Sequence, residues 1–570
     1  MPKKLNKIIM PKRLNKALLI LGGLIFQFIN FATPLLAQKD STGRGVDILS
    51  SFRPSIRSAA KVDFSPGPVS PDTSRPVLSY KVPNQQLPLG YTITSLRPLA
   101  YSYDSVLTFT AHPFLKVGYG NLKTPFLQGR YAWGDGYEKG VQVSASHISS
   151  KGKIEHQRYS SSTASLGGFK RWDPASLRGE GKISLAIDNI NKYGYQFANP
   201  LPLVTPVDDS IKQRFTTLQV QGSISSTKPS ALGVAYSAQV LVSHFRDRGG
   251  NAETGFRLQA PLQKYLGENW RVDLTLAAEG TTLLLKDNSS LVNNMASLSP
   301  IIHHWNQKFS FQAGLRPTWD PKGFRLLPVL NASILSTDKK WTLQLGWEGQ
   351  LEKTTYRSLA SSNPWLWTPG KLLNSSIDEK YIGVKASIGN HFYFNARSGY
   401  AVIRDMPLFV NDSASLGDGK SFQVVYEDRL RRLQLKGEVG YGVADRFQAG
   451  ASIVINQFSG LVSQPHVWGV LPMEFNANLK VNILKDLLVK ADLFAWRGAR
   501  YRLKEGTDKR LSGAFDFNAG LEFKLTPSLR LWAQFNNLLN NTYQRWNQYP
   551  VYGFNCTAGV VFSPHQKKKN

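Results

Sequence analysis

Hydrophobic and polar residues alternate with a period of two along the C-terminal part of the chain. In residues 515–525 the apolar positions are Phe515, Phe517, Ala519, Leu521, Phe523 and Leu525. The same alternation recurs in residues 529–536 and 554–563. A period of two places the apolar side chains on one face of a strand. Each run is about ten residues long, the length of a tilted strand that crosses a bilayer. These residues therefore predict the last three strands of a transmembrane barrel, apolar outside and polar inside.

The alternation begins near Phe114, and we count about 22 strand segments between residues 113 and 563. An even number is typical of bacterial outer-membrane barrels. If the first strand rises from the periplasm, every second connection lies on the periplasmic side. These connections are short, and the connections on the outer side are long. The short set includes 135–136, 173–174 and 484–485, with 261–267 as its longest member, and the long set includes 191–210, 353–377, 403–420, 498–511 and 538–552. A soluble sandwich would not show this asymmetry. The sequence predicts an all-β fold, a transmembrane antiparallel β-barrel with long extracellular loops and short periplasmic turns.

The N-terminus has the pattern of a signal peptide over residues 1–37. Six cations precede an apolar run over residues 17–31, and Leu35-Leu36-Ala37 offers a cleavage site before Gln38. The alternative is a membrane anchor, but the apolar run is short and contains Gln27 and Asn30. No later run approaches the ~20 apolar residues of a transmembrane helix. Together with the barrel pattern, this segment predicts an integral protein of a Gram-negative outer membrane.

Two further segments flank the barrel. Residues 38–112 are rich in proline, which disfavours long regular elements. We expect them to lie in the periplasm or to enter the barrel lumen. Residues 564–570 form a short basic tail that ends in three lysines and an asparagine.

The formal net charge is +30, and removal of the six signal-peptide cations leaves +24. Export argues against nucleic acid as the partner, and the barrel pattern favours outer-membrane lipids, including the anionic lipid of the outer leaflet. One predicted outer loop carries a cluster of cations. Its members are Arg497, Arg500, Arg502, Lys504, Lys509 and Arg510. They are candidates for contact with lipid phosphates or an anionic ligand, and the alternative is an ordinary solvated loop.

Two groups of residues resemble the TonB-dependent receptors. One is Asn536-Asn537-Leu538-Leu539-Asn540-Asn541-Thr542-Tyr543 followed by Tyr552-Gly553-Phe554. The other is Tyr356-Arg357-Ser358-Leu359 with Asn363-Pro364-Trp365-Leu366 and the strand that starts near Tyr381. The resemblance covers about residues 114–563 and implies a 22-stranded barrel that takes up siderophores, vitamins or glycans across the outer membrane. It also implies that Phe562 is the terminal aromatic residue of a barrel-assembly signal.

The chain departs from that family in its N-terminal part. Residues 38–112 are short for the family's plug domain, and we find no plug motif or TonB box. Three functions therefore remain open: a solute receptor or transporter, a plugless structural subunit of an outer-membrane complex, and an open diffusion porin. A separate plug or lipoprotein chain would restore the transporter function. An empty barrel of this width would leak, which disfavours the porin.

The sequence shows no pattern of an enzyme, a cofactor site or a metal site. Gly419-Lys420-Ser421 resembles the end of a phosphate-binding loop, but Ala414 replaces the first glycine and no strand–helix unit surrounds it. His303 and His304 are adjacent on a strand, so they point to opposite faces and are poorly placed to chelate one ion. The single cysteine, Cys556, lies at a predicted lipid-facing position and can form no intramolecular disulfide.

Overall fold

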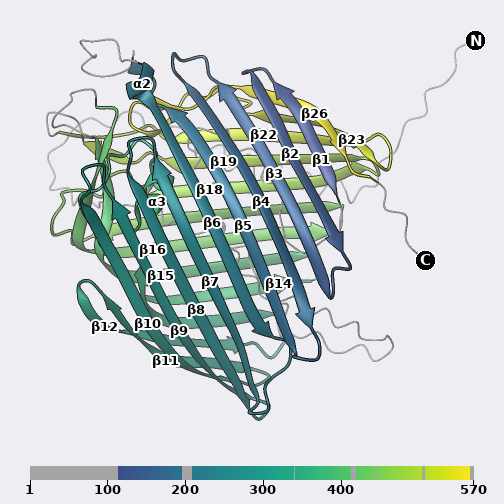
Figure 1. The fold of residues 1–570 in the computed structure, drawn as a ribbon, viewed down its shortest axis with the longest axis vertical. Coiled ribbons are helices and arrows are strands. Elements are labelled where there is room, and N and C mark those ends of the chain that lie inside the picture. Colours follow the sequence, from purple (N-terminus) through teal and green to yellow (C-terminus); the bar gives the residue numbers. More distant parts are fainter. Residues whose placement is uncertain are drawn as a thin grey trace, which may run out of the picture. The chain divides into compact units, whose positions relative to one another are not determined.

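The strands form one closed antiparallel barrel of 22 strands (Figure 1). The computed structural model describes residues 113–195, 208–338, 340–389, 391–411, 419–443, 446–502 and 507–564. The barrel closes because β1 pairs with both β2 and β26. This confirms the predicted fold class and the predicted number of strands. The signal peptide, residues 38–112 and the end of the basic tail lie outside the described residues, so those predictions stand as predictions.

The barrel strands are β1 (Phe114–Gly120), β2 (Thr124–Gly134), β3 (Lys139–Lys151), β4 (Arg158–Trp172), β5 (Leu177–Asn191), β6 (Lys212–Ser226), β7 (Val234–Asp247), β8 (Ala252–Leu266), β9 (Trp270–Leu284), β10 (Ser290–Trp305), β11 (Phe309–Asp320), β12 (Gly323–Leu335), β13 (Trp341–Glu352), β14 (Ser375–Ile388), β15 (Phe392–Asn411), β16 (Phe422–Val443), β17 (Phe447–Ser459), β18 (Met473–Leu484), β19 (Leu487–Arg497), β22 (Ala514–Lys524), β23 (Leu529–Asn536) and β26 (Asn555–Phe562). Short elements in the outer loops are α2 (Asp208–Ile211), α3 (Tyr356–Ser362), β20 (Arg500–Arg502), β21 (Asp508–Arg510), β24 (Gln544–Trp546) and β25 (Tyr549–Pro550). None of the helices in the described ranges is long and apolar enough for a membrane crossing.

The predicted faces of the last strands are confirmed. Phe515 and Phe523 of β22 are exposed on the outer wall, whereas Asp516 and Asn518 between them are buried on the inner side. The outer face continues onto the neighbouring strands, where Cys556 pairs with Phe535. Phe562 ends β26 on the same outer face and is exposed. A belt of exposed apolar side chains around a barrel is the surface that a bilayer solvates.

The inner wall carries paired charges. Lys490 of β19 lies 2.7 Å from Glu522 of β22, and Arg257 of β8 lies 2.9 Å from Glu279 of β9. His303 faces this wall, 2.9 Å from Asp273, whereas His304 faces outward. The two histidines therefore lie on opposite faces, as predicted. Within the described residues no group of three or more metal-ligating side chains occurs.

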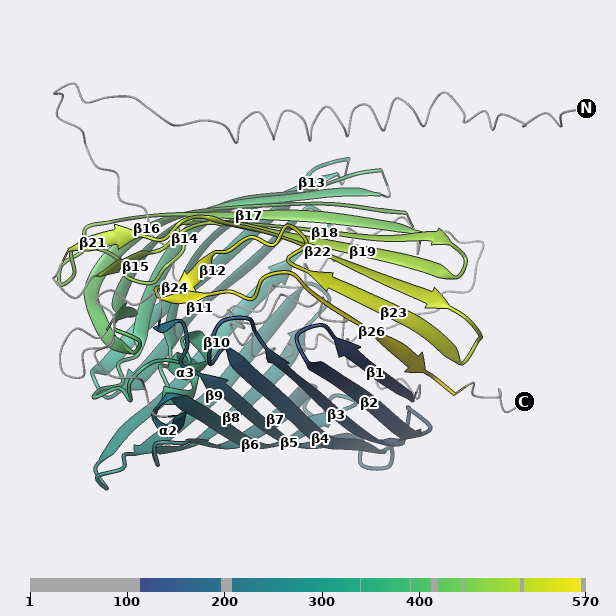
Figure 2. The same ribbon diagram turned by 90° about the horizontal axis from the view of Figure 1, so that it is seen from above.

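Two boundaries differ from the sequence-based prediction. The 261–267 connection is short, because β8 continues through Pro261 to Leu266. Proline lacks a backbone N–H and interrupts the pairing with β7, while the pairing with β9 continues. The predicted loop at 403–420 is also shorter, because β15 extends to Asn411 and β16 begins at Phe422. Figure 2 shows β15 and β16 at the end of the barrel where the long connections gather.

Candidate ligand-binding site at the outer mouth

The loop between β13 and β14 folds inward and begins with helix α3. Thr355 caps this helix, because its side chain accepts the backbone N–H of Ser358 at 3.0 Å. The Ser358 hydroxyl in turn accepts the backbone N–H of Thr355, which completes a capping box. The buried face of the helix includes Tyr356, Leu359 and Ala360. Tyr356 and Leu359 belong to the second group of residues that resembles TonB-dependent receptors.

Two carboxylates from neighbouring strands hold the start of α3. Asp247, the last residue of β7, accepts a hydrogen bond from the Tyr356 hydroxyl at 2.7 Å. Glu253 of β8 accepts the backbone N–H groups of Tyr356 and Arg357. Carboxylates are favourable at a helix N-terminus, because the first N–H groups of the helix have no partner within it.

The base of the same loop is held by a pair of buried amides. Asn293 of β10 donates to the Asn374 side-chain oxygen at 2.7 Å, and Asn374 donates back to Asn293 at 2.9 Å. Asn293 also donates to the carbonyl of Thr354 at 2.9 Å. One residue of β10 therefore binds both ends of the loop.

The connection between β23 and β26 contains the first stretch that resembles the family. Asn537 adopts a left-handed backbone conformation with a φ of 48°. Its side-chain amide donates to the carbonyls of Asn541 and Tyr552 at 2.8 and 3.0 Å. The Tyr543 hydroxyl donates to the Asp516 carboxylate inside the barrel. These bonds turn the chain from β23 towards the mouth of the barrel, so the motif has a structural role here.

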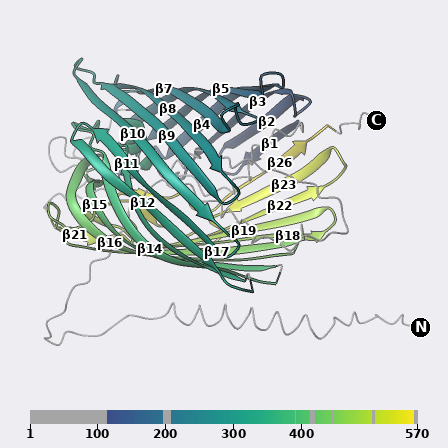
Figure 3. The same ribbon diagram turned by 90° about the horizontal axis from the view of Figure 1, so that it is seen from below.

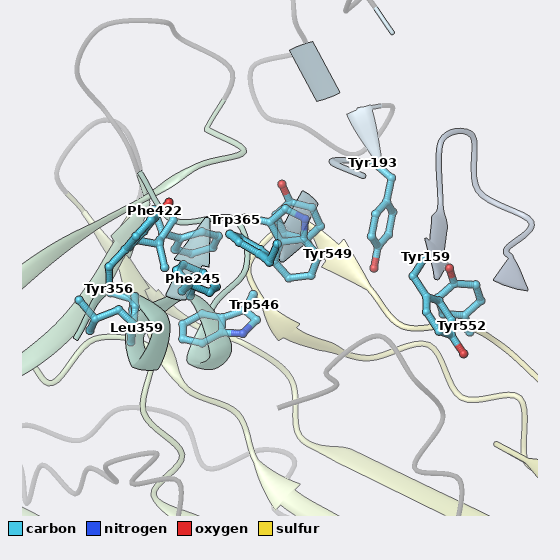
Figure 4. Close-up of a cluster of buried hydrophobic side chains, with 14 of the residues drawn as sticks. Tyr159, Tyr193, Phe245, Tyr356, Leu359, Trp365, Phe422, Trp546, Tyr549 and Tyr552 are labelled. Atoms are coloured by element: carbon cyan, nitrogen blue, oxygen red, sulfur yellow. The ribbon is translucent and has the colours of Figure 1, made fainter. Parts of the chain in front are cut away.

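Aromatic side chains from both loops meet in one buried cluster (Figure 4). Trp365 stacks on Tyr549 with ring centroids 3.7 Å apart and planes 12° apart. Tyr193, after β5, packs edge-on against Tyr549 at 5.2 Å and donates its hydroxyl proton to the carbonyl of Pro550. Trp546 packs edge-on against Phe422 at the start of β16. The cluster therefore joins the wall that contains β5 to the wall that contains β16, and it crosses the outer mouth.

Lys420 of the Gly419-Lys420-Ser421 string is part of this assembly. Its side chain is buried, and its ammonium donates to the carbonyls of Gly194 and Gln548 at 2.7 and 3.1 Å. It also lies 5.3 Å from the centre of the Tyr549 ring. The lysine thus connects three outer loops. This position agrees with the interpretation of the string as ordinary loop sequence.

The structure brings together part of the predicted basic cluster. Arg500 and Arg510 face each other across the β20–β21 hairpin, and Arg502 faces Asp508 there. Arg500 forms an ion pair with Asp508. Partial burial, together with the charges of Arg497 and Arg500, lowers the pKa of Arg510. Arg497, which ends β19, and Lys509 are exposed, and Lys504 lies outside the described residues.

The basic hairpin adjoins the segment that crosses the mouth. Gly469 donates its backbone N–H to the carbonyl of Arg500 at 2.9 Å, and its own carbonyl accepts from Arg545 at 3.0 Å. Arg545 is next to Trp546 of the aromatic cluster. In the described residues, Arg500 Nε and Arg510 Nη1 are buried without a hydrogen-bond partner. The sequence indicated the cations but not their connection to the mouth.

Lys353, next to α3, provides a prediction on pH dependence. Burial lowers its pKa from 10.5 to about 8, with Arg257 adding to this effect and Glu279 and Glu253 opposing it. The unfolded chain therefore binds more protons than the folded chain between pH 8 and 10.5, so stability rises with pH across that window. Below pH 8 Lys353 is protonated in both the folded and the unfolded chain. Its destabilising effect on the folded chain is therefore the same at every pH below 8.

We expect Lys353→Met to unfold at a higher temperature than the wild type below pH 8. The difference should shrink between pH 8 and 10.5, when measured by thermal unfolding in detergent micelles. Lys371, an exposed lysine of the same loop, is the control, and Lys371→Met should give a small difference. A difference for Lys353→Met that does not change with pH would contradict the predicted titration.

The structure resembles solved outer-membrane receptors. The FrpB iron transporter of Neisseria meningitidis (F3-3 variant) superposes with a TM-score of 0.61 at 12% identity, over 80% of this chain and 81% of that chain. The ferric-catecholate import receptor Fiu of E. coli K12 gives 0.60 at 10%, over 80% and 82%. The pyoverdine receptor FpvA of Pseudomonas aeruginosa gives 0.58 at 10%, over 79% and 78%.

The chain has the barrel fold of these receptors. The predicted resemblance to TonB-dependent receptors and the predicted outer-membrane barrel are thereby confirmed at the level of the fold. No family model and no curated protein sequence matches the chain. At 10–12% identity, what these structures share with the chain is the fold.

Proposed function

We propose that this protein binds a solute at its outer loops and takes it up across the outer membrane. The observation that supports this most directly is the aromatic cluster that crosses the outer mouth. A diffusion porin needs a continuous water-filled path, whereas a receptor presents folded loops to the outside. Two of the loops that form the cluster are the ones that resemble TonB-dependent receptors. The solved neighbours include an iron transporter and a ferric-catecholate import receptor.

We further propose that the solute is anionic. The described outer loops place Arg500 and Arg510 beside the segment that crosses the mouth, with buried nitrogen atoms that have no hydrogen-bond partner. Guanidinium groups match carboxylate, phosphate and catecholate oxygens well. The positive net charge would also speed the arrival of an anionic solute. Ferric chelates are the first class to test, because the solved neighbours include an iron transporter and a ferric-catecholate import receptor.

The test is a titration of the purified full-length protein in detergent, followed by tryptophan fluorescence. A ferric catecholate, a ferric hydroxamate and a neutral oligosaccharide are the probes. Saturable quenching by one of the chelates with a Kd in the micromolar range or tighter is the expected result. Arg510→Gln should weaken it about tenfold, a loss of ~1.4 kcal/mol, whereas Lys308→Gln at the opposite end of the barrel should not. Absence of saturable binding by every probe would contradict the proposal.

Residues 38–112 are proposed to block the lumen or to bind a periplasmic partner. They are tethered to β1, so their concentration at the barrel mouth is high. We expect deletion of residues 38–100, behind an intact signal peptide, to convert a quiet barrel into a large and steady pore in planar bilayers. Strong conductance of the full-length protein would contradict this idea and support the porin. Low conductance of both proteins would show that the outer loops or another chain close the barrel.

A further inference from the structure

A cross-strand pair of arginines lies on the outer wall of the barrel. Arg404 of β15 and Arg429 of β16 are direct partners in the antiparallel ladder. Both are exposed, and so is Arg431, which pairs with Val402. Like charges directly opposite each other on a sheet are destabilising. Such a pair is stabilised when an anion binds between the two guanidinium groups.

The register places these arginines on the side that faces the membrane. Tyr400 and Leu433 are partners in the same ladder, and both are exposed apolar residues of the outer belt. Arg404 is four residues from Tyr400, and Arg429 is four residues from Leu433. Because side chains alternate between the two faces of a strand, all four lie on the same face. The residues of opposite parity, Ile403 and Leu430, are fully buried. The arginines therefore project outward, just beyond the apolar belt.

Their height on the barrel matches the outer leaflet. The outward apolar residues of β16 run from Tyr441, near the short turn, to Leu433, about the length of one bilayer-crossing strand. Arg431 and Arg429 follow directly, on the side of the long loops. Along the membrane normal, this position is at the level of the lipid headgroups.

Two of the nearby carboxylates, Glu427 and Asp378, have other partners. Glu427 is fully buried and accepts backbone N–H groups of residues 462–464. Asp378, on the outer wall of β14, accepts a hydrogen bond from the indole N–H of Trp347 at 2.7 Å. Asp428 is exposed, and within the described residues no ion pair joins it to Arg404, Arg429 or Arg431. Arg404, Arg429 and Arg431, here called the basic group, outnumber Asp428 and therefore present a net positive charge to the headgroup region.

An apolar groove lies directly below the arginines on the same strands. It is a shallow, open depression of about 510 Å³ that extends across the outer wall from β11 to β16. Small side chains at Ala332 and Ser398 make the hollow between the larger residues. The larger residues on the outer wall that line it are Leu330, Leu345, Trp347, Ile382, Tyr400 and Leu433. A groove of this size is within the range of roughly 300–1,000 Å³ that holds small ligands.

Lys380 joins the groove to the basic group. It is exposed on the outer wall and lines the groove, with its ammonium 4.9 Å from the centre of the Trp347 ring. The ammonium thus lies at the upper end of the apolar groove, and the three guanidinium groups lie above it. This arrangement complements a molecule with a phosphorylated head and hydrocarbon chains. Arginine is suited to such a head, because its planar fork binds two phosphate oxygens at once.

We propose that this face binds a phosphorylated glycolipid of the outer leaflet, with its phosphate between Arg404, Arg429 and Arg431 and an acyl chain in the groove. The site shares no side chain with the solute site proposed at the outer mouth, because it lies on the outer wall of the barrel, whereas the aromatic cluster and the basic hairpin lie at the mouth. It also differs from the basic loop that the sequence indicated. Bound lipid would neutralise the arginine pair and fill the hollow in the belt.

The test is native mass spectrometry of the full-length protein released from detergent micelles that contain a defined lipid. The probes are bis-phosphoryl lipid A, phosphatidylglycerol and phosphatidylcholine. We expect one lipid A to remain bound, and the double variant Arg404→Gln/Arg429→Gln to reduce its affinity at least tenfold. The matched control Lys264→Gln/Lys308→Gln removes two exposed cations near the short turns and should leave retention unchanged. Heat-dependent mobility on gels verifies that each barrel is folded.

A second variant tests the groove separately from the charges. Ser398→Phe fills the hollow and should reduce lipid A retention at least fivefold, whereas Ala558→Phe, on the outer face of β26, should not. Equal retention of phosphatidylcholine and lipid A would overturn the proposal, since the arginines would then contribute nothing. It would also be overturned if inorganic phosphate displaced the lipid completely and Ser398→Phe had no effect, because the site would then bind a free anion. Preferential retention of phosphatidylglycerol would overturn the assignment to a glycolipid.

Discussion

Replacement of Trp365 by alanine is expected to release the loops from the outer mouth. Trp365 is 1% exposed, stacks on Tyr549, and donates its indole N–H to the carbonyl of Asn191. Removal of a buried tryptophan side chain costs about 3–5 kcal/mol. The loss falls on the docking of the loops, since the paired strands of the wall do not depend on this residue. Hydrogen exchange of residues 353–374 should therefore accelerate by two orders of magnitude or more, and conductance in planar bilayers should rise.

The same loop supplies the control. Trp367 is 39% exposed and Trp365 is 1% exposed, so Trp367→Ala removes a residue of the same type with a smaller loss of buried surface. It should leave the exchange rates of residues 353–374 close to those of the wild type. Heat-dependent mobility on gels should be unchanged in both variants, because the barrel itself stays folded. Equal exchange in the two variants would show that the stacked pair does not hold the loops.

A charge on the outer wall of β22 should destabilise the barrel far more than a charge on its inner wall. Ala519 lies in the middle of β22, on the outer face, between Ala491 and Phe535 of the adjacent strands. Ala519→Arg places a guanidinium in the hydrocarbon, at a cost of about 2–4 kcal/mol near the midplane. The measurement is the urea midpoint for unfolding from lipid vesicles.

The neighbouring residue provides the comparison. Gly520 faces the inner wall, and a Cβ atom there would come no nearer than 3.8 Å to Lys490 or to the Ala533 carbonyl. An arginine at this position has room and reaches the ion pair of Lys490 with Glu522. We expect Gly520→Arg to cost less than half as much as Ala519→Arg. Equal losses, or the reverse order, would contradict the assignment of the two faces.

The alternation in the sequence predicted the barrel because each strand obeys a local rule. Phe515 and Asp516 are adjacent, and only one of them can face the hydrocarbon, so the pattern alone determines which does. The rule fails where both faces of a strand are buried. In β15, Met406, Leu408, Phe409 and Val410 are all buried beside the outer loops, and Asp405 adopts a positive φ of 56°. The alternation is lost there, and the sequence therefore predicted a loop for residues that extend the strand.

The candidate sites depend on contacts that no local pattern contains. Tyr193 and Pro550 are hydrogen-bonded although 357 positions separate them, and Lys420 donates to Gly194 and Gln548, which are 226 and 128 positions away. The basic hairpin was visible as a run of cations, but its link to Trp546 through Gly469 was not. A loop with tightly packed aromatic residues and a solvated loop have similar compositions, because packing depends on where the neighbouring strands place their ends.

By itself, the sequence determined the all-β class, the closed barrel of about 22 strands, the membrane face of the last three strands and the side on which the long loops lie. These follow from the period of two and from the lengths of the connections, both of which are local properties of the chain. Only the tertiary structure decided that the outer loops cross the mouth and that Arg404 faces Arg429 above an apolar groove. The physical reason is that burial and charge pairing depend on the register between strands and on contacts between distant loops, which form only when the barrel closes (Figure 3).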